Sequence, residues 1–260
     1  MQSITNTFLA IVLAHLAGDF PLQTESIIRA KQRGLAGLVI HGLVHYLALM
    51  AALLAFSPAR VGTLYCQGLL LVYVAFHVLL DFLKIRYLRL RGRPDSTAPF
   101  LVDQLLHVLA ALALSLGLLK VSPFQLNTEG MWTDPVKQRV LLILVTYAAV
   151  IFAGGYLVRS MTRSLTENMP APEGENKAAL RNAGLYIGWL ERFLVLTAFL
   201  IQSPAMIGLI LTGKSIARLG ELKGPKFAEY FLIGTLLSVS MALSGGIFLM
   251  LTLYGSVLRR

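Results

Sequence analysis

The feature that most constrains the fold is a series of long apolar stretches separated by short basic segments. The chain has 260 residues, of which 56% are hydrophobic and only 14% are charged, and its mean hydropathy is +0.70. Soluble domains carry nearer a quarter charged residues, and one membrane crossing takes about 20 apolar residues. We therefore expect an all-α protein, a polytopic transmembrane helical bundle with seven or eight membrane segments.

The apolar stretches also predict how the chain is organised. The expected helices span residues 4–20, 35–56, 62–83, 99–120, 139–158, 182–201 and 227–254. The run 204–213 is too short for a full crossing, which predicts a short helix or a re-entrant element. We expect an N-terminal bundle (1–158), a cytoplasmic linker rich in Pro and Glu (159–181) and a C-terminal helical half (182–260) packed on the first.

Basic residues predict the orientation of the helices. The net charge is +10, and the positive residues cluster between apolar stretches, as in loops beside an anionic leaflet rather than in a nucleic-acid site. The segments 24–34, 84–98 and 159–181 are therefore expected to be cytoplasmic. The first apolar stretch follows no positive charge, so we expect it to be a retained helix rather than a cleaved signal. A single cysteine, Cys66, excludes an intramolecular disulfide and a cysteine-based metal site.

Four pairs of ionisable residues lie in or at the edge of these stretches, each with i,i+4 spacing. They are His15/Asp19, His41/His45, His77/Asp81 and Asp103/His107, and they contain all five histidines of the protein. In an α-helix this spacing leaves both side chains on one face, about 6 Å apart along the axis. Ionisable groups at membrane depth are energetically expensive, which makes them candidates for a functional site.

The predicted topology puts all four pairs at a similar depth. Each lies near the end of a predicted helix that adjoins a cytoplasmic segment. We therefore expect the eight groups to meet near the cytoplasmic face, inside a bundle of the kind that commonly holds metal ions. Imidazole and carboxylate together suit zinc, iron or manganese. The prediction is a divalent-metal site, in which some carboxylates orient histidines instead of binding the ion.

Other interpretations of the four pairs stay open at this point. The groups could hydrogen-bond only to fix helix packing, could form a proton or ion pathway, or could ligate haem. Haem does not need three aspartates beside the histidines, and four pairs at one depth exceed what packing requires. A non-haem metal site is favoured over these alternatives.

Further polar residues are candidates for a second layer around the metal or for substrate binding. Near the pairs they are Gln23, Lys84 and Gln104, and in the C-terminal half they are Glu191, Arg192, Lys214, Arg218 and Glu229. The alternative for Lys84 is extension toward the membrane interface. The C-terminal charges either pair with one another or form an anion pocket, and we predict that the basic ones line the His/Asp cavity.

Several motifs resemble a family of bacterial multi-pass membrane proteins known as a domain of unknown function. They are Leu13-Ala-His15-Leu-Ala-Gly18-Asp19-Phe20-x-x-Gln23, His77-x-x-x-Asp81-x-x-Lys84 and Asp103-Gln104-x-x-His107, all within residues 5–120. Gly188-Trp-Leu-Glu191-Arg192, Lys214-Ser-Ile-Ala-Arg218 and Glu229-Tyr-Phe-Leu-Ile-Gly234-Thr235 are similar to longer members. The His/Asp pairing also resembles predicted inner-membrane metal-dependent hydrolases. The resemblance implies that the protein lies in a bacterial inner membrane. The family has no established activity, so the resemblance implies no reaction.

The expected function is a metal-dependent membrane enzyme, a hydrolase of a lipid-borne or phosphorylated substrate. The alternative is a transporter or channel for a metal ion or proton, and a further alternative is a structural or regulatory membrane protein. The expected partners are membrane lipid and an anionic or lipid-borne substrate, with no nucleic acid.

Overall fold

A computed structural model describes residues 4–58, 61–92, 96–120, 135–166 and 183–254. Every element within these ranges is helical and none is a strand, which confirms the predicted all-α class. By its internal contacts the chain divides into two compact units, here called unit 1 (Met1–Val145) and unit 2 (Thr146–Arg260). The first part of the expected linker is helical in α7 (Gly154–Thr166), and its remainder, 167–181, lies outside the described residues.

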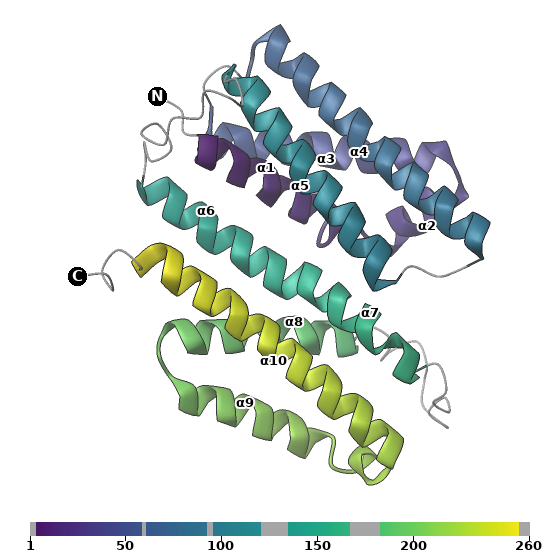
Figure 1. Ribbon diagram of the computed structural model, residues 1–260, viewed down its shortest axis with the longest axis vertical. Coiled ribbons are helices and arrows are strands. Elements are labelled where there is room, and N and C mark those ends of the chain that lie inside the picture. The colour runs from purple at the N-terminus through teal and green to yellow at the C-terminus, as the bar shows by residue number, and fades with distance from the viewer. Residues whose placement is uncertain (1–3, 59–60, 93–95, 121–134, 167–182, 255–260) are drawn as a thin grey trace. The chain divides into compact units, whose positions relative to one another are not determined.

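Unit 1 is built on four long helices, drawn from purple to teal in Figure 1. They are α1 (Ile4–Asp19), α3 (Leu35–Phe56), α4 (Leu64–Arg91) and α5 (Thr97–Leu119). Each packs on two of the others, in the ring order α1, α3, α4, α5. A closed ring turns one face of every helix inward, so residues on those four faces meet. The start of α6 (Pro135–Ala148) adds Leu141 to the apolar core formed by Leu9 and Ala10 of α1.

A short helix, α2 (Glu25–Arg33), occupies the segment that sequence analysis treated as a basic loop. The Thr24 hydroxyl caps it by accepting a hydrogen bond from the amide of Ile27 at 3.4 Å. The helix packs on α3, where Gly37 lies so close to the backbone of Ala30 that no larger residue would fit. The polar segment is therefore part of the folded bundle.

Helix α4 is longer than predicted. It continues past Leu83 to Arg91, because the leucines and arginines of this stretch are good helix formers, although the arginines lower its hydropathy. Gly92 ends the helix in a left-handed conformation (φ 58°), and its amide donates to the carbonyl of Arg89 at 3.2 Å.

Unit 2 consists of α7, α8 (Ala183–Leu200), α9 (Pro204–Ala217) and α10 (Pro225–Tyr254). A π-helical turn, η3 (Ala149–Ala153), precedes α7, and a 3₁₀ turn, η4 (Glu221–Lys223), precedes α10. Helix α10 packs on α7 and α8, and α8 packs on α9. Their shared core includes Val195, Leu196 and Ala242. Helix α9 is the short helix that sequence analysis predicted as one of two outcomes.

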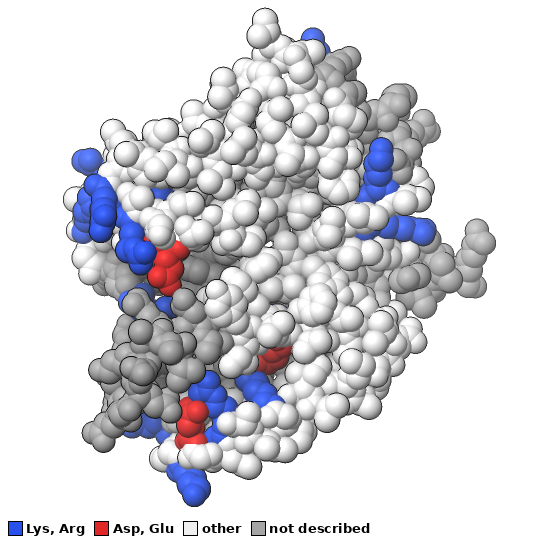
Figure 2. All heavy atoms as spheres, turned by 180° about the vertical axis from the view of Figure 1, so that it is seen from behind, with Lys and Arg blue, Asp and Glu red and all other residues white. Residues whose placement is uncertain are grey.

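Five described helical segments are long and apolar enough to cross a membrane. They are Leu35–Phe56, Leu64–Arg91, Thr97–Leu119, Pro135–Arg163 and Pro225–Leu253, with Ile4–Asp19 and Pro204–Ala217 as shorter apolar helices. The face drawn in Figure 2 is mostly free of Lys, Arg, Asp and Glu, and large residues such as Leu64, Leu90 and Leu209 are exposed. These features fit a multi-pass membrane protein. The count of seven or eight crossings stays a prediction.

Candidate metal centre

The helices of the ring bring all four i,i+4 pairs together. The groups that could share an ion are His15, Asp19, His45 and His77, then His41, His77 and Asp81, and finally Asp81, Asp103 and His107. Within each group, one ligand atom per residue lies within 4.8 Å of the others. Because His77 and Asp81 each belong to two groups, the three groups form one continuous cluster. We call these eight residues the His/Asp cluster.

The five imidazoles pack against one another in the interior of unit 1. All are at most 1% exposed. The ring centroids of His45 and His77 are 3.8 Å apart, and those of His77 and His107 are 4.3 Å apart. The Nε2 atoms of His41 and His77 are separated by 3.1 Å. One of these two nitrogens can donate to the other. His41 Nε2 also lies 3.2 Å from a carboxylate oxygen of Asp19 and of Asp81, which is more acceptors than its one N–H can satisfy.

Asp19 is the carboxylate that most histidines share. Its Oδ1 lies 3.0 Å from His45 Nε2, 3.2 Å from His41 Nε2 and 3.5 Å from His77 Nε2. Its Oδ2 lies 3.5 Å from His15 Nε2. The chain can reach this geometry because Asp19 is the last residue of α1, one turn beyond His15. A single carboxylate therefore contacts imidazoles from three helices.

A close approach at Gly18 positions one of these rings. A Cβ atom added there would lie 2.5 Å from Cε1 and 2.6 Å from Nε2 of His45. Real Cβ atoms do not come so close, so only glycine lets the His45 ring lie against α1 beside Asp19. The Gly18-Asp19 sequence is thus part of the site's geometry.

Lys31 is a site residue that sequence reasoning missed. Its Nζ lies 2.5 Å from Asp81 Oδ2, an oxygen that is also 3.2 Å from His41 Nε2. The amide of Gln23, oriented so that both of its polar atoms are satisfied, accepts from Lys31 Nζ at 2.9 Å and donates to the Asp19 carbonyl at 3.3 Å. Helix α2 thereby closes one end of the cluster. The sequence shows Lys31 only as one of several basic residues in a polar segment, and no spacing rule links it to Asp81.

The third aspartate has a lysine of its own. Lys84 Nζ donates to Asp103 Oδ2 at 3.2 Å and lies 5.8 Å from the ring centroid of Phe100. Gln104 Nε2 donates to Asp103 Oδ2 and to Asp19 Oδ2, each at 3.4 Å, and its Oε1 accepts from His15 Nε2 at 3.3 Å. The three predicted neighbours of the pairs, Gln23, Lys84 and Gln104, therefore all contact the cluster. Their functional roles stay predictions.

His107 has the orientation expected of a metal ligand. Its Nδ1 donates to the backbone carbonyl of Asp103 at 2.8 Å, which leaves the Nε2 lone pair free. That Nε2 is buried and has no hydrogen-bond partner among the described residues. Metal-binding histidines commonly donate their second nitrogen in this way. In the other four histidines it is Nδ1 that is buried without a partner in the described part of the chain.

Tyr73 is a second residue that the pair pattern did not reveal. It lies one helical turn before His77 on the same face of α4, it is buried, and its hydroxyl finds no hydrogen-bond partner within the described ranges. A buried hydroxyl without a partner is costly. Its i,i−4 spacing from His77 is a signal in the sequence that could have indicated this position.

In unit 2, Glu191 and Lys214 form an ion pair. Lys214 Nζ also donates to Thr235 Oγ1 at 2.9 Å and lies 5.2 Å from the ring centroid of Phe231. These contacts link α8, α9 and α10. They match the alternative in which the C-terminal charges pair with one another.

Arg192 is buried and bonded to neutral oxygens. Its Nε and Nη2 donate to the carbonyl of Ile151 at 3.1 and 2.8 Å, and its Nη1 contacts Ser238 Oγ at 3.3 Å. Ile151 lies in the π-helical turn η3. The guanidinium group therefore ties α8 to that turn and to α10.

Arg218 and Glu229 lie at more open positions. Arg218 Nη1 donates to Glu221 Oε2 at 2.7 Å, and Glu229 is exposed and has no ion pair with any other described residue. That Arg192, Lys214 and Arg218 line the His/Asp cavity stays a prediction, as does a role of Glu191 and Glu229 in metal or substrate binding.

Comparison with known proteins identifies a family for the N-terminal part of the chain. No curated protein and no solved structure matches the chain. The model of the family described as "Protein of unknown function (DUF3307)" matches residues 7–132, a little under half of the sequence. The matched range holds all eight residues of the His/Asp cluster together with Lys31 and Tyr73, and it agrees with the resemblance seen over residues 5–120. Residues 7–132 are therefore a domain of the DUF3307 family.

Proposed function

We propose that this protein is a metal-dependent membrane enzyme, a hydrolase that acts on a lipid-borne or phosphorylated substrate. The observation that supports the proposal most is the set of three overlapping ligand groups, each with its atoms within 4.8 Å of one another. The proposed cofactor is zinc, iron or manganese, since imidazole and carboxylate ligands suit these ions.

The charge of the cluster favours a divalent cation. Three carboxylates face two ammonium groups, those of Lys31 and Lys84, so one negative charge is left when the imidazoles are neutral. A buried charge without compensation is costly. The free Nε2 lone pair of His107 points to the same need. A cation that accepts nitrogen and oxygen lone pairs would offset both.

His41, His45, His77 and His107, with Asp19 and Asp81, are the proposed ligands. When bound, a divalent metal would polarise a phosphoryl oxygen and make a water molecule a better nucleophile. The side chains of Lys31 and Lys84 are 10% and 19% exposed, whereas the histidines are almost fully buried. The two lysines are therefore the groups that we propose for binding the phosphate oxygens of an anionic substrate.

Asp103 and Lys84 form the proposed acid–base pair. In hydrolysis the oxygen of water bonds to phosphorus and the ester oxygen leaves. Asp103 accepts the proton of the water, and Lys84 donates a proton to the leaving oxygen. Because Lys84 Nζ and Asp103 Oδ2 are 3.2 Å apart, the proton can then return directly from the carboxyl group to the amine.

We further propose a bacterial inner membrane, with the segments 24–34, 84–98 and 159–181 on the cytoplasmic side. The support is the cluster of basic residues at the end of α4 and in α2. Under this orientation Lys31 and Lys84 lie toward the cytoplasmic end of unit 1. A substrate with a phosphate group at the cytoplasmic headgroup level and an acyl part in the membrane would fit that position.

Elemental analysis of protein purified without chelator tests the proposal. We expect a stoichiometric transition metal in the wild type, and a large loss of metal in His77→Ala, since His77 belongs to two of the ligand groups. The exposed carboxylate variant Glu25→Gln is the matched control and should retain the metal. Metal-dependent release of phosphate from a lipid phosphomonoester in detergent micelles should follow the same order. Weak, exchangeable metal without hydrolysis would favour transport instead, and wild-type protein without metal would contradict the proposal.

A further inference from the structure

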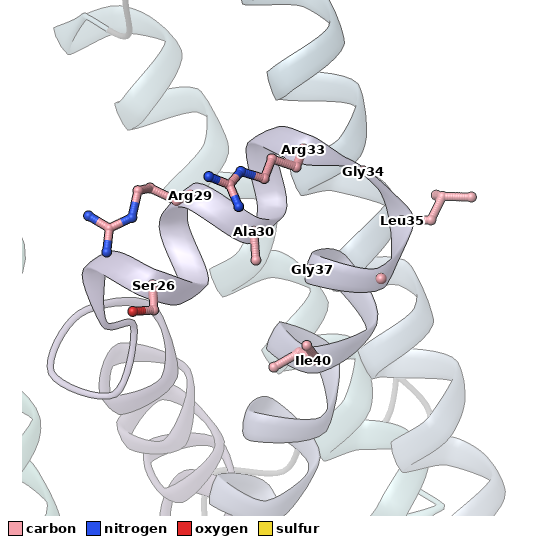
Figure 3. A pocket seen from close by; sticks show the side chains of 9 residues that line it. Ser26, Arg29, Ala30, Arg33, Gly34, Leu35, Gly37 and Ile40 are labelled. Atoms are coloured by element: carbon pink, nitrogen blue, oxygen red, sulfur yellow. The ribbon is translucent and has the colours of Figure 1, made fainter.

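A groove outside the His/Asp cluster runs along the contact between α2 and the start of α3 (Figure 3). Its volume is about 550 Å³. Ser26, Arg29 and Arg33 of α2 line one side, and Leu35 and Ile40 of α3 line the other. The groove therefore has one basic wall and one apolar wall.

The basic wall is one face of α2. Ser26, Arg29 and Arg33 follow at i, i+3 and i+7, a spacing that keeps them on the same side of a helix. Figure 3 shows both guanidinium groups extending to that side. Lys31 lies about 160° around the helix from Arg33, at 3.6 residues per turn, and pairs with Asp81 of the cluster. One short helix thus turns a lysine toward the interior and two arginines toward the groove.

Both arginines are available for a ligand. Arg29 pairs with Glu25 one turn earlier at 3.2 Å, and both side chains are more than half exposed, so this contact holds the guanidinium only weakly. Arg33 is exposed and has no hydrogen bond or ion pair with any other residue that the structure describes. Two cations and one anion leave the basic wall with a net positive charge.

The apolar wall belongs to a helix that is long and apolar enough to cross the membrane. Leu35 and Ile40 are 70% and 50% exposed. Val39 and Leu43 continue this exposed surface along the first turns of α3. Since the groove lies where that span begins, it is at the level of lipid headgroups, with lipid chains beside α3.

We propose that this groove is a binding site for an anionic phospholipid. Arg29 and Arg33 hold the phosphate oxygens, a geometry that the planar guanidinium group matches well. Ser26 donates a further hydrogen bond, and the acyl chains lie along Val39 and Leu43. Free phosphate would gain nothing from Leu35 and Ile40, and a lipid without net charge would gain little from the positive wall. The site does not depend on a metal ion in the cluster.

Native mass spectrometry of the full-length protein tests the site. Protein is equilibrated with equal amounts of phosphatidylglycerol and phosphatidylcholine, and we expect preferential retention of phosphatidylglycerol. In Arg29→Ala/Arg33→Ala this retention should weaken about tenfold or more, because a basic residue at the membrane surface contributes about 1 kcal/mol to binding of anionic lipid. The matched control, Arg86→Ala/Arg91→Ala, removes the same charge from the exposed end of α4 and should keep the preference.

A second variant tests whether the shape of the groove matters as well as its charge. Ser26→Trp leaves both arginines and fills the space between the helices, so it should also lose the bound phosphatidylglycerol. The proposal is overturned if the α4 control loses lipid as strongly as the α2 variant, because the effect is then diffuse charge. It is also overturned if Ser26→Trp binds normally, or if millimolar inorganic phosphate displaces the lipid. Unchanged unfolding temperatures identify the variants as folded.

Discussion

The two units bury ionisable groups in opposite ways. In unit 2 the cations outnumber the carboxylates, and each cation has fixed protein acceptors: Lys214 has Glu191 and Thr235, and Arg192 has the Ile151 carbonyl. In unit 1 the balance is reversed. Among the described residues, five imidazoles and three carboxylates face only Lys31 and Lys84, and acceptors outnumber donors. The one N–H that His41 Nε2 can carry faces His77 Nε2 at 3.1 Å and carboxylate oxygens of Asp19 and Asp81, each at 3.2 Å.

The difference indicates two roles for buried polar groups in one chain. Donors that are matched by protein oxygens on neighbouring helices act as cross-links within unit 2, and they require nothing from outside the protein. In unit 1, buried acceptors outnumber donors, and each acceptor without a donor lowers stability. A bound cation or proton would compensate for that cost. Mutations in the two clusters should therefore respond differently to metal.

The largest effect is expected from Lys214→Ala in unit 2. The substitution leaves Glu191 buried without its cation, and breaking a buried pair in this way costs about 3–5 kcal/mol of unfolding free energy. Thermal unfolding in detergent should show a much lower midpoint, which Glu191→Gln in the same chain should largely restore. Metal content should be unchanged. A stable Lys214→Ala protein that had lost metal would overturn the comparison and would support the predicted basic wall of the His/Asp cavity.

Pair spacing was sufficient to predict the centre of unit 1, and the reason is physical. Side chains at i and i+4 must share a helix face, and polar faces in a membrane bundle turn toward one another. Four helices each carry such a polar face, for example the one with His77 and Asp81. These faces avoid lipid when all four point into the centre of the bundle. The long helices were predictable for a similar reason, since the apolar stretch of α3 (Leu35–Phe56) has the same bounds in the sequence and in the structure.

Contacts made by short or polar segments were not predictable in this way. Lys31 lies in a nine-residue helix without an apolar run, so hydropathy could not detect the helix and no period tied the lysine to Asp81. Hydropathy does not predict the extension of α4 to Arg91, because arginines lower the hydropathy of a segment without preventing it from being helical. The hydrogen bonds from Arg192 to the Ile151 carbonyl could not be predicted either. They depend on the π-helical turn at Ile151, and the amino-acid composition does not indicate that turn.

A smaller effect is expected from Gly18→Ala, which tests how closely the cluster of unit 1 is packed. The added Cβ would lie 2.5 Å from His45 Cε1, so the ring must move away from Asp19. Overpacking of this kind costs about 1–3 kcal/mol, and we expect metal to be lost as well. Gly68→Ala in α4 is the control, since no atom lies within 4 Å of the new methyl group; it should be neutral or stabilise by about 0.5–1 kcal/mol. If Gly18→Ala and Gly68→Ala had the same stability and metal content, the His45 ring would not need to lie against Gly18.

The smallest and most discriminating effect is expected from Lys31→Met. Without metal, the substitution removes the ammonium group from Asp81 and adds to the negative charge of the cluster. The cost should be only about 1 kcal/mol, near the usual net value of one hydrogen bond, because Asp81 Oδ2 keeps His41 Nε2 as a possible donor at 3.2 Å.

Bound metal should remove the stability difference between Lys31→Met and the wild type. A divalent cation bound by the cluster supplies the positive charge that Lys31 had supplied, so saturating zinc or manganese should raise the unfolding midpoint of Lys31→Met to that of metal-loaded wild type. The same addition should leave the deficit of Lys214→Ala unchanged, because Glu191 belongs to no group of potential metal ligands among the described residues. Parallel melting curves of both variants, with and without metal, measure this directly. If metal restores neither variant, the lone pairs of unit 1 are not offset by an ion, and both clusters serve only to hold helices together.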